Sequence, residues 1–289
     1  MAALPERIFK YVSSERIDIL EKLLIRFTQP SCFNDPFEMR VSVEGHSPES
    51  LDRAEDEVYK NQFVKYVLRG GEHSSKKFRK IQKSHNRTAM RKLKFDSHFQ
   101  KQAATDYAFK KWDSQIGILS LSAAEKNLLM WAHYADSHRG MLIEFNPKHI
   151  FFNGPNPSDA EFNFGMLTKV IYSKDRPKDR VGVTSVLEII PMLKIKSEEW
   201  IKEQEWRVYE MLDRRAEQVA KGSETVHLFK LPPDCIKRVV VGYNMGYKGR
   251  KRVADAVKTN PKLKDVRIDE SFLCLDSFSL EYQPLARLY

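Results

Sequence analysis

Apolar residues in the first half of the chain change between the period of a strand and that of a helix. Ile8–Val12 predicts a short strand, and a helix follows it, capped by one of two serines, in which Ile17 and Leu20 recur at helical spacing. Further strands are predicted at Leu24–Thr28, Gln115–Leu121 and Gly140–Phe145, with a helix over Ala123–Ser137.

The second half continues this alternation. Predicted helices cover Val183–Leu193, Ser197–Glu203 and Lys248–Val257. Predicted strands are Leu167–Tyr172, Glu205–Met211, Thr225–Phe229, Ile236–Gly242, Val266–Ile268 and Phe278–Tyr282. No strand is followed by a G-x-G-x-x-G or G-x-x-x-x-G-K-[ST] loop, so a Rossmann or P-loop enzyme is not expected. We expect an α+β fold with a mixed, mainly antiparallel, split sheet and flanking helices.

One region departs from this pattern, because residues 47–112 read as long polar helices broken at Gly70 and Gly71. We predict a single domain over residues 1–289 that contains a basic helical insertion at 47–112. Between Arg69 and Lys94 the sequence has ten Lys or Arg and one Glu, more than pairing along a helix balances. A solvated helix face is the alternative to a polyanion contact. The candidate nucleic-acid-binding residues are Lys76, Lys77, Arg79, Lys80, Lys83, Arg87, Arg91 and Lys92.

Charge supports an anionic partner for the whole chain. The 289 residues include 49 Lys and Arg against 39 Asp and Glu, a net charge of +10. The three cysteines are scattered, which argues against a disulfide scaffold or a zinc cluster. The N-terminus has no signal-peptide core, and no apolar run is long enough for a membrane span. We therefore expect a cytoplasmic protein without a membrane partner.

Three segments combine polar and aromatic residues at unusual density: CFNDPFE at 32–38, LSLSAAEKNLLMWAHYADSHRG at 119–140 and WIKEQEWR at 200–207. Over roughly residues 8–245 the chain resembles a prokaryotic family of unknown function marked by FNDPFE, MWAHYADxHxG and WxxExEWR. The arrangement also resembles the ADP-ribosyltransferase superfamily, which includes toxins that modify nucleic acid. This second resemblance implies NAD as co-substrate.

In such transferases a carboxylate stabilises the cationic ribose that forms when nicotinamide leaves. The superfamily pattern of Glu or Gln, any residue, then Glu implies that Glu205 is the catalytic carboxylate and Glu203 its helper. Two residues apart on a strand, they would share one face. The alternative is a surface strand edge on which Arg207 forms an ion pair, with Trp206 in the core on the other face.

The resemblance also implies a binding site for NAD on the first strand. Relatives carry His or Arg there, whereas this chain has Lys10 beside Tyr11, and a lysine holds pyrophosphate only as a point charge. In the LSLS strand, Ser120 is the better site candidate, because Ser122 is expected to cap the following helix with Glu125 in a capping box.

The helix before Gly140 supplies further candidates. Tyr134 would stack on nicotinamide, while His133 or Arg139 contacts phosphate or ribose; packing of the Tyr and His between helix and sheet is the alternative. The spacing HxxDxH from His133 to His138 fits no established metal motif, so we expect no metal. In the FNDPFE loop we assign function to Asp35 and structure to its neighbour Asn34, with Phe33 and Phe37 in the core.

These observations favour an NAD-dependent ADP-ribosyltransferase that modifies nucleic acid, RNA above DNA. Because such an activity harms its own cell, the hypothesis implies a bacterial toxin or phage-defence effector restrained by an antitoxin. Two alternatives stay open. One is a metal-dependent nuclease in which Asp35, His133, Glu203 and Glu205 hold Mg²⁺ or act as acid and base. The other is a non-enzymatic nucleic-acid-binding defence protein.

Overall fold

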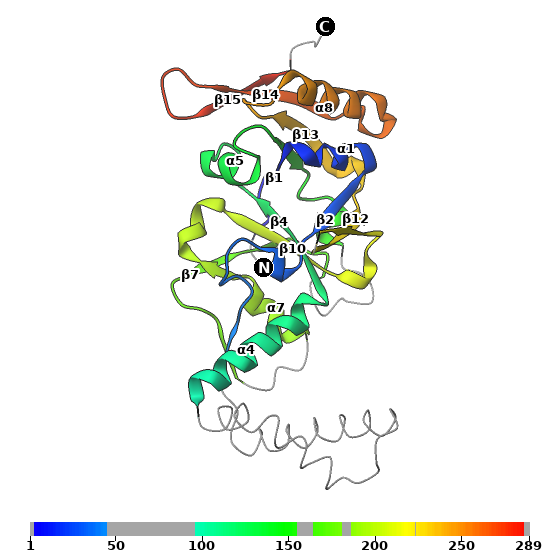
Figure 1. The fold of residues 1–289 in the computed structure, drawn as a ribbon. Helices are drawn as coiled ribbons and strands as arrows, with labels where there is room; N and C mark the ends of the chain where they lie inside the picture. The colour runs from blue at the N-terminus through cyan, green and yellow to red at the C-terminus, as the bar shows by residue number, and fades with distance from the viewer. Residues whose placement is uncertain (1–2, 45–95, 155–163, 181–185, 223, 286–289) are drawn as a thin grey trace. The chain divides into compact units, whose positions relative to one another are not determined.

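A computed structural model describes residues 3–44, 96–154, 164–180, 186–222 and 224–285 (Figure 1). The chain forms two compact units, each treated separately below. The first comprises Met1–Met39, Trp112–Asp175 and Leu193–Tyr289, and the second comprises Arg40–Lys111 and Arg176–Met192.

The first unit contains an eight-stranded sheet in the order β15-β14-β13-β5-β1-β4-β10-β6. Only the pair β13–β14 is parallel among the described strands of this sheet, so the predicted mixed, mainly antiparallel α+β fold is confirmed. The strands are β1 (Ile8–Val12), β4 (Ile116–Ser122), β5 (Met141–Phe145), β6 (Thr168–Lys169), β10 (Glu205–Met211), β13 (Ile236–Val241), β14 (Arg267–Leu273) and β15 (Leu280–Pro284).

This sheet is split between β1 and β4. Strand β1 pairs with β5 along all five of its residues, but with β4 only at Phe9, which lies opposite Ser122. The gap leaves backbone groups of β4 without a strand partner, and the Lys10 ammonium donates a hydrogen bond across it to the Ser120 carbonyl (2.9 Å). A side chain therefore replaces part of the missing ladder.

Alternation along β1 divides the core between the two faces of the sheet. Ile8 and Val12 lie in the larger cluster, which the apolar faces of α1 (Asp18–Lys22) and α8 (Tyr247–Thr259) complete. Phe9 and Tyr11 lie on the opposite face, where Trp131 and Ala135 cover them; α5 (Leu128–Tyr134) carries this Trp. Figure 1 shows α5 and α8 beside the same sheet. Among the described residues, no helix has both the length and the hydropathy needed to cross a bilayer.

Smaller elements complete the first unit. A three-stranded sheet has the order β11-β12-β2, and β7 pairs with β9 in parallel. The strands are β2 (Leu24–Phe27), β7 (Ile171–Ser173), β9 (Ile195–Ser197), β11 (Glu217–Lys221) and β12 (Glu224–Lys230). The short helices are η1 (Ser14–Ile17), η2 (Pro30–Cys32), α6 (Ile150–Asn153), η4 (Glu198–Glu203), η5 (Leu212–Arg214), η6 (Pro233–Cys235) and η7 (Pro261–Leu263).

The second unit pairs β3 (Ser42–Glu44) with β8 (Lys178–Arg180) in parallel. Its helices are α7 (Val186–Leu193), whose last residue belongs to the first unit, and most of α4 (Ser97–Asp113). Arg40 packs over the Phe109 ring at 4.0 Å and pairs with Asp106 at 3.0 Å, which attaches the start of this unit to α4. Helix α4 covers the C-terminal end of the segment predicted as a helical insertion, whose residues 47–95 lie outside the described part.

Several local predictions were wrong. The helix expected over Ala123–Ser137 is confined to Leu128–Tyr134, and Asn127 caps it through its side-chain oxygen. The predicted strand Leu167–Tyr172 is divided into two short strands, β6 and β7, in different sheets. Phe37 was expected in the core but is 63% exposed.

Gly140 follows α5 where three backbone segments meet. A Cβ there would lie 2.0 Å from the Val12 carbonyl oxygen, which flexible side chains cannot relieve. We therefore expect Gly140→Ala to lower the free energy of unfolding by about 3 kcal/mol or more in urea denaturation. Gly246→Ala is the control, since nothing lies within 4 Å of the added carbon; it should cost at most about 1 kcal/mol as a helix cap. Equal losses for both variants would contradict this packing.

Candidate functional site

The three polar segments found in the sequence meet in one place. The FNDPFE loop brings Glu38, α5 brings Tyr134, and the segment around β10 brings Glu203, Glu205 and Arg207. Glu203 ends η4, Gln204 takes a left-handed conformation (φ 46°), and Glu205 begins β10. The prediction that the two glutamates share a strand is therefore wrong. The turn at Gln204 brings their carboxylates together instead.

At the centre of the cluster is Lys196 of β9. Its ammonium lies 2.6 Å from the Glu203 carboxylate, 2.9 Å from Glu205 and 3.6 Å from Glu38. The ring of Trp200 lies 5.0 Å from the same nitrogen. With 3% of its side chain exposed, Lys196 has these groups in place of water.

Arg207 is the second buried cation, with no exposed side-chain surface. Its Nε donates to Glu205 (2.7 Å), a terminal nitrogen pairs with Glu38, and another donates to the Leu193 carbonyl (2.8 Å). Strand β10 lies between β4 and β6, so Arg207 is not on a surface edge. The predicted ion pair is present, but it is internal; Trp206 lies in the larger core cluster, as expected.

In the described part of the chain, the ion pairs of the cluster join three carboxylates, Glu38, Glu203 and Glu205, to two cations, Lys196 and Arg207. Burial raises the pKa of Glu205, and the nearby Lys196 charge opposes but does not cancel that rise. For Lys196, burial lowers the pKa, but the charges of Glu205 and Glu203 outweigh it and the pKa rises. Lys196 is thus fixed as a cation, whereas Glu205 holds a proton more readily than an exposed glutamate.

Tyr134 and Asn34 form the outer boundary of the cluster. The Tyr134 hydroxyl donates to Glu203 (2.7 Å), and the exposed Asn34 amide donates to that hydroxyl (3.4 Å). Burial and then the Glu203 charge raise the pKa of Tyr134, so the phenol remains protonated and acts as donor. On the inner side the Tyr172 hydroxyl accepts from the Glu205 amide (2.8 Å).

The connection between β4 and α5 is attached directly to the glutamate segment. Ser122 donates to the Glu203 carbonyl (2.6 Å), and Asn127 donates to the Lys202 carbonyl (2.6 Å). Ser122 also accepts from the Ala124 amide, so it closes a turn and is not the predicted helix cap. The predicted capping box is likewise wrong, because the Glu125 carboxylate pairs with arginines.

Two predicted cofactor residues on β1, Lys10 and Tyr11, make their hydrogen bonds to backbone carbonyls and not to side chains of this cluster. Lys10 shares the face of Ile8 and Val12, opposite to the face of Phe9, and its ammonium binds the Ser120 carbonyl. Burial, followed by the charge of Arg16, lowers the pKa of Lys10 to about 8. Tyr11 is buried edge-on against Trp131 (5.4 Å between ring centroids). Its hydroxyl contacts the backbone carbonyls of Ala124 and Glu125, whereas Lys10 lies close enough to Glu205 for the two charges to interact.

The remaining predicted residues divide into inner and outer positions. Ser120 lies directly opposite Arg207 in the strand register and shares its face. The buried Asp35 accepts a hydrogen bond from the Phe37 amide (2.8 Å) and closes a turn. The loop residue that contacts Tyr134 is its neighbour Asn34. His133 and Arg139 are exposed; the His ring lies beside Tyr134, and Arg139 pairs with Asp136 (3.0 Å).

The turn after α5 has an unusual backbone. Asp136, Ser137 and His138 have φ values of 51°, 51° and 66°, a conformation that costs L-residues roughly 1–2 kcal/mol each. The His138 ring stacks on Trp131 at 5.9 Å and its carbonyl accepts from the Asn244 amide, so the surroundings hold the turn. In the part of the chain that the structure describes, no three His, Cys, Asp or Glu are grouped to hold a metal.

Sequence reasoning missed Lys196 and Glu38. Lys196 lies in an ordinary-looking Lys-Ile-Lys-Ser run, and in β9 it is the buried residue between two half-buried neighbours. Glu38 belonged to the recognised FNDPFE segment but was not selected. The predicted nucleic-acid contacts between Lys76 and Lys92 lie outside the described residues and stay predictions.

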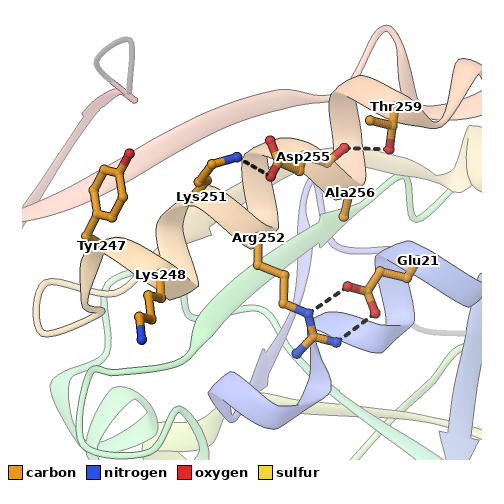
Figure 2. A pocket seen from close by; sticks show the side chains of 8 residues that line it. All are labelled: Glu21, Tyr247, Lys248, Lys251, Arg252, Asp255, Ala256 and Thr259. Carbon is orange, nitrogen blue, oxygen red and sulfur yellow. Dashed lines mark hydrogen bonds and ion pairs between the residues drawn. The ribbon is translucent and has the colours of Figure 1, made fainter. Parts of the chain in front are cut away.

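Two surface hollows lie near charged residues. One of about 440 Å³ adjoins the cluster and is lined by Asn127, Leu129, Lys202 and Gln204 among others. Another of about 340 Å³ lies between α1 and α8 (Figure 2). There Arg252 pairs with Glu21 (2.7 Å) and Lys251 with Asp255 (2.7 Å), so most of its charge is satisfied internally. The first hollow is lined by Lys202 and Gln204, the chain neighbours of Glu203, but not by Glu203 or Glu205.

One family model matches a part of the chain that contains several residues of this site. Residues 130–208 match the model of a family described as a protein of unknown function, DUF2971. This stretch includes Tyr134, Lys196, Glu203 and Glu205, but not Asn34 and Glu38. No curated protein and no solved structure matches the chain.

Removal of the central cation tests the cluster. Lys196→Met leaves buried carboxylates without their partner and should lower the free energy of unfolding at pH 7.5 by about 3–5 kcal/mol. Because the Lys196 charge no longer opposes the effect of burial, the folded-state pKa of Glu205 rises further above its unfolded value. The folded form then binds protons more tightly, and stability is regained as pH falls through that pKa.

Urea denaturation at pH 7.5 and pH 5 measures this effect. The exposed Lys202→Met is the control, and its stability should stay within about 0.5 kcal/mol of wild type at both pH values. A Lys196→Met variant as stable as wild type at pH 7.5 would show that the cluster does not need its central charge.

Proposed function

We propose that the protein is an NAD-dependent ADP-ribosyltransferase that transfers ADP-ribose to nucleic acid, with RNA as the favoured acceptor. In this proposal it is a bacterial toxin or phage-defence effector that an antitoxin restrains. The observation that carries the proposal is the hydrogen bond from Tyr134 to Glu203, two residues before Glu205, in a cluster assembled from three separate segments.

The chemistry requires a fixed negative charge beside the reacting ribose. The bond between nicotinamide and the ribose C1′ breaks, nicotinamide leaves with the electron pair, and the acceptor oxygen or nitrogen bonds to C1′ as it loses its proton. Glu205, oriented by Arg207 and Lys196, would stabilise the cationic ribose. Glu203 is the more exposed carboxylate (10% against 5%) and would take the acceptor's proton.

Tyr134 would serve at the boundary between this cluster and the substrate. Its hydroxyl orients Glu203, and its aromatic ring provides a surface for nicotinamide to stack upon. Both glutamates contact Lys196 in the free protein, so NAD has to share or displace that contact when it binds. The exposed His133 and Arg139 remain candidates for phosphate or ribose contacts.

A metal-dependent nuclease receives less support from the same geometry. The carboxylates of Glu203 and Glu205 are directed at an ammonium and a guanidinium, and among the described residues no metal-holding group of three is present. The burial of the cluster does favour a second candidate, in which these charges are structural and the chain is a nucleic-acid-binding defence protein. In both candidates the basic residues near Lys76–Lys92 supply the contact with nucleic acid.

Replacement of one catalytic oxygen distinguishes the candidates. With labelled NAD and RNA, DNA or cell lysate, wild-type protein should transfer label to one acceptor class. Glu205→Gln should lower that rate by about 10²–10³-fold, because it removes the charge that stabilises the ribose cation. Glu199→Gln, an exposed change on the same segment, should leave the rate unchanged.

Absence of both transfer and NAD hydrolysis, in folded wild-type protein free of inhibitor, would refute the transferase. If RNA binding then survives Glu205→Gln but is lost when Lys76, Lys77, Arg79 and Lys80 are neutralised, the binding protein is the correct candidate.

A further inference from the structure

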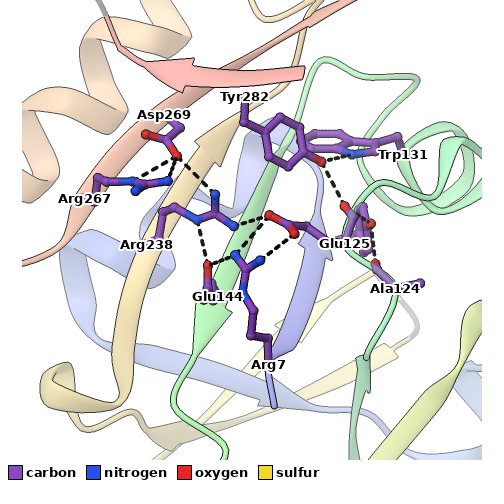
Figure 3. Close-up of polar contacts among 10 residues, drawn as sticks. Arg7, Ala124, Glu125, Trp131, Glu144, Arg238, Arg267, Asp269 and Tyr282 are labelled. Carbon is purple, nitrogen blue, oxygen red and sulfur yellow. Dashed lines mark hydrogen bonds and ion pairs between the residues drawn. The ribbon is translucent and has the colours of Figure 1, made fainter. Parts of the chain in front are cut away.

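A second polar network lies next to α5, where side chains of β5, β13 and β14 meet Arg7, the residue before β1 (Figure 3). Its charges balance, because three arginines face three carboxylates. The ion pairs join Arg7 to Glu125 and Glu144, Arg238 to Glu125, Glu144 and Asp269, and Arg267 to Asp269. Unlike the Lys196 cluster, this network has equal numbers of positive and negative side chains, so no charged ligand is needed to balance its charge.

The network binds Glu125 in residues 123–127, the connection between β4 and α5. Arg7 pairs with the Glu125 carboxylate at 2.6 Å, and Arg238 binds the same group. The Glu125 carbonyl accepts from the hydroxyl of Tyr282 (2.8 Å) and from that of Tyr11 (2.6 Å). The same connection is also attached to the glutamate segment, because the Ala123 amide donates to the Gln204 carbonyl (3.0 Å).

Tyr282 also reaches α5 itself. Its hydroxyl accepts from the indole nitrogen of Trp131 (3.1 Å), and the two rings meet edge-on at 6.5 Å. Trp131 is fully buried and precedes Tyr134 by three residues, less than one helical turn. One oxygen atom of Tyr282 therefore joins the start of the connection and the helix that carries Tyr134.

Tyr282 comes from β15, which lies at the edge of the sheet and pairs with β14. It is 74 residues beyond the stretch that matches the DUF2971 model, which ends at 208. We propose that Tyr282 is a positioning residue, which sets the place of Tyr134 against Glu203 through Trp131 and the Glu125 carbonyl. The catalytic part of this inference rests on the proposed transferase, whereas the positioning itself does not.

Hydrogen–deuterium exchange tests the positioning without any activity. Tyr282→Phe removes the oxygen and keeps the ring, so the core is preserved. Peptides covering 123–134 should exchange about tenfold faster, since two hydrogen bonds that hold them are lost. Peptides from α8 should be unchanged, and Tyr243→Phe, at an exposed tyrosine, should leave 123–134 as in wild type. Unaltered exchange of 123–134 in folded Tyr282→Phe would overturn the proposal.

A double-mutant cycle tests the catalytic part. If Tyr282 acts through Tyr134, Tyr282→Phe should lower kcat for NAD about tenfold while KM changes little, and it should have no further effect in a Tyr134→Phe background. Additive losses would reject the coupling. A wild-type protein without NAD activity, together with faster exchange in Tyr282→Phe, would refute the transferase and leave the positioning role standing.

Discussion

The burial of Glu38, Glu203 and Glu205 in one place is the constraint on which the site depends. Carboxylates removed from water need cations and donors at short range, and Lys196 and Arg207 supply them with almost no exposed surface. Because the five residues come from the FNDPFE loop, β9, η4 and β10, satisfying this one requirement fixes four segments relative to one another. Two of the three polar motifs, CFNDPFE and WIKEQEWR, thus contribute to one internal ion-pair network, and the third joins it through the Tyr134 hydrogen bond.

The split in the sheet lies one strand away from β10, which carries Glu205 and Arg207 of this network. Where it separates from β1, β4 remains paired with β10, and the connection that follows β4 is hydrogen-bonded to the carbonyls of Lys202, Glu203 and Gln204. Helix α5 then closes the outer side with Tyr134, and its own position is determined by contacts on both flanks. The scaffold therefore positions the site through hydrogen bonds to backbone carbonyls as much as through packing.

Periodicity predicted the fold class and most strands, because buried strands such as β4 and β10 have continuous apolar and β-branched runs. It could not predict the late start of α5, where Ser122 and Asn127 bind the glutamate segment instead of extending the helix. Nor does any local signal reveal the left-handed turn at Gln204, which tertiary contacts impose. Glu203, Glu205 and Tyr134 were selected correctly as neighbours, whereas Lys196 is identifiable only once β9 has its place beside β7.

The hydrogen bond from Lys10 to the Ser120 carbonyl gives the split a further property. A primary amine donates hydrogen bonds both with and without its extra proton, and burial lowers the pKa of Lys10 to about 8. Titration of this group near neutral pH therefore alters its charge but not its role as donor. The hydrogen bond across the split can therefore persist on both sides of that pKa, although the residue that donates it changes charge close to the physiological range.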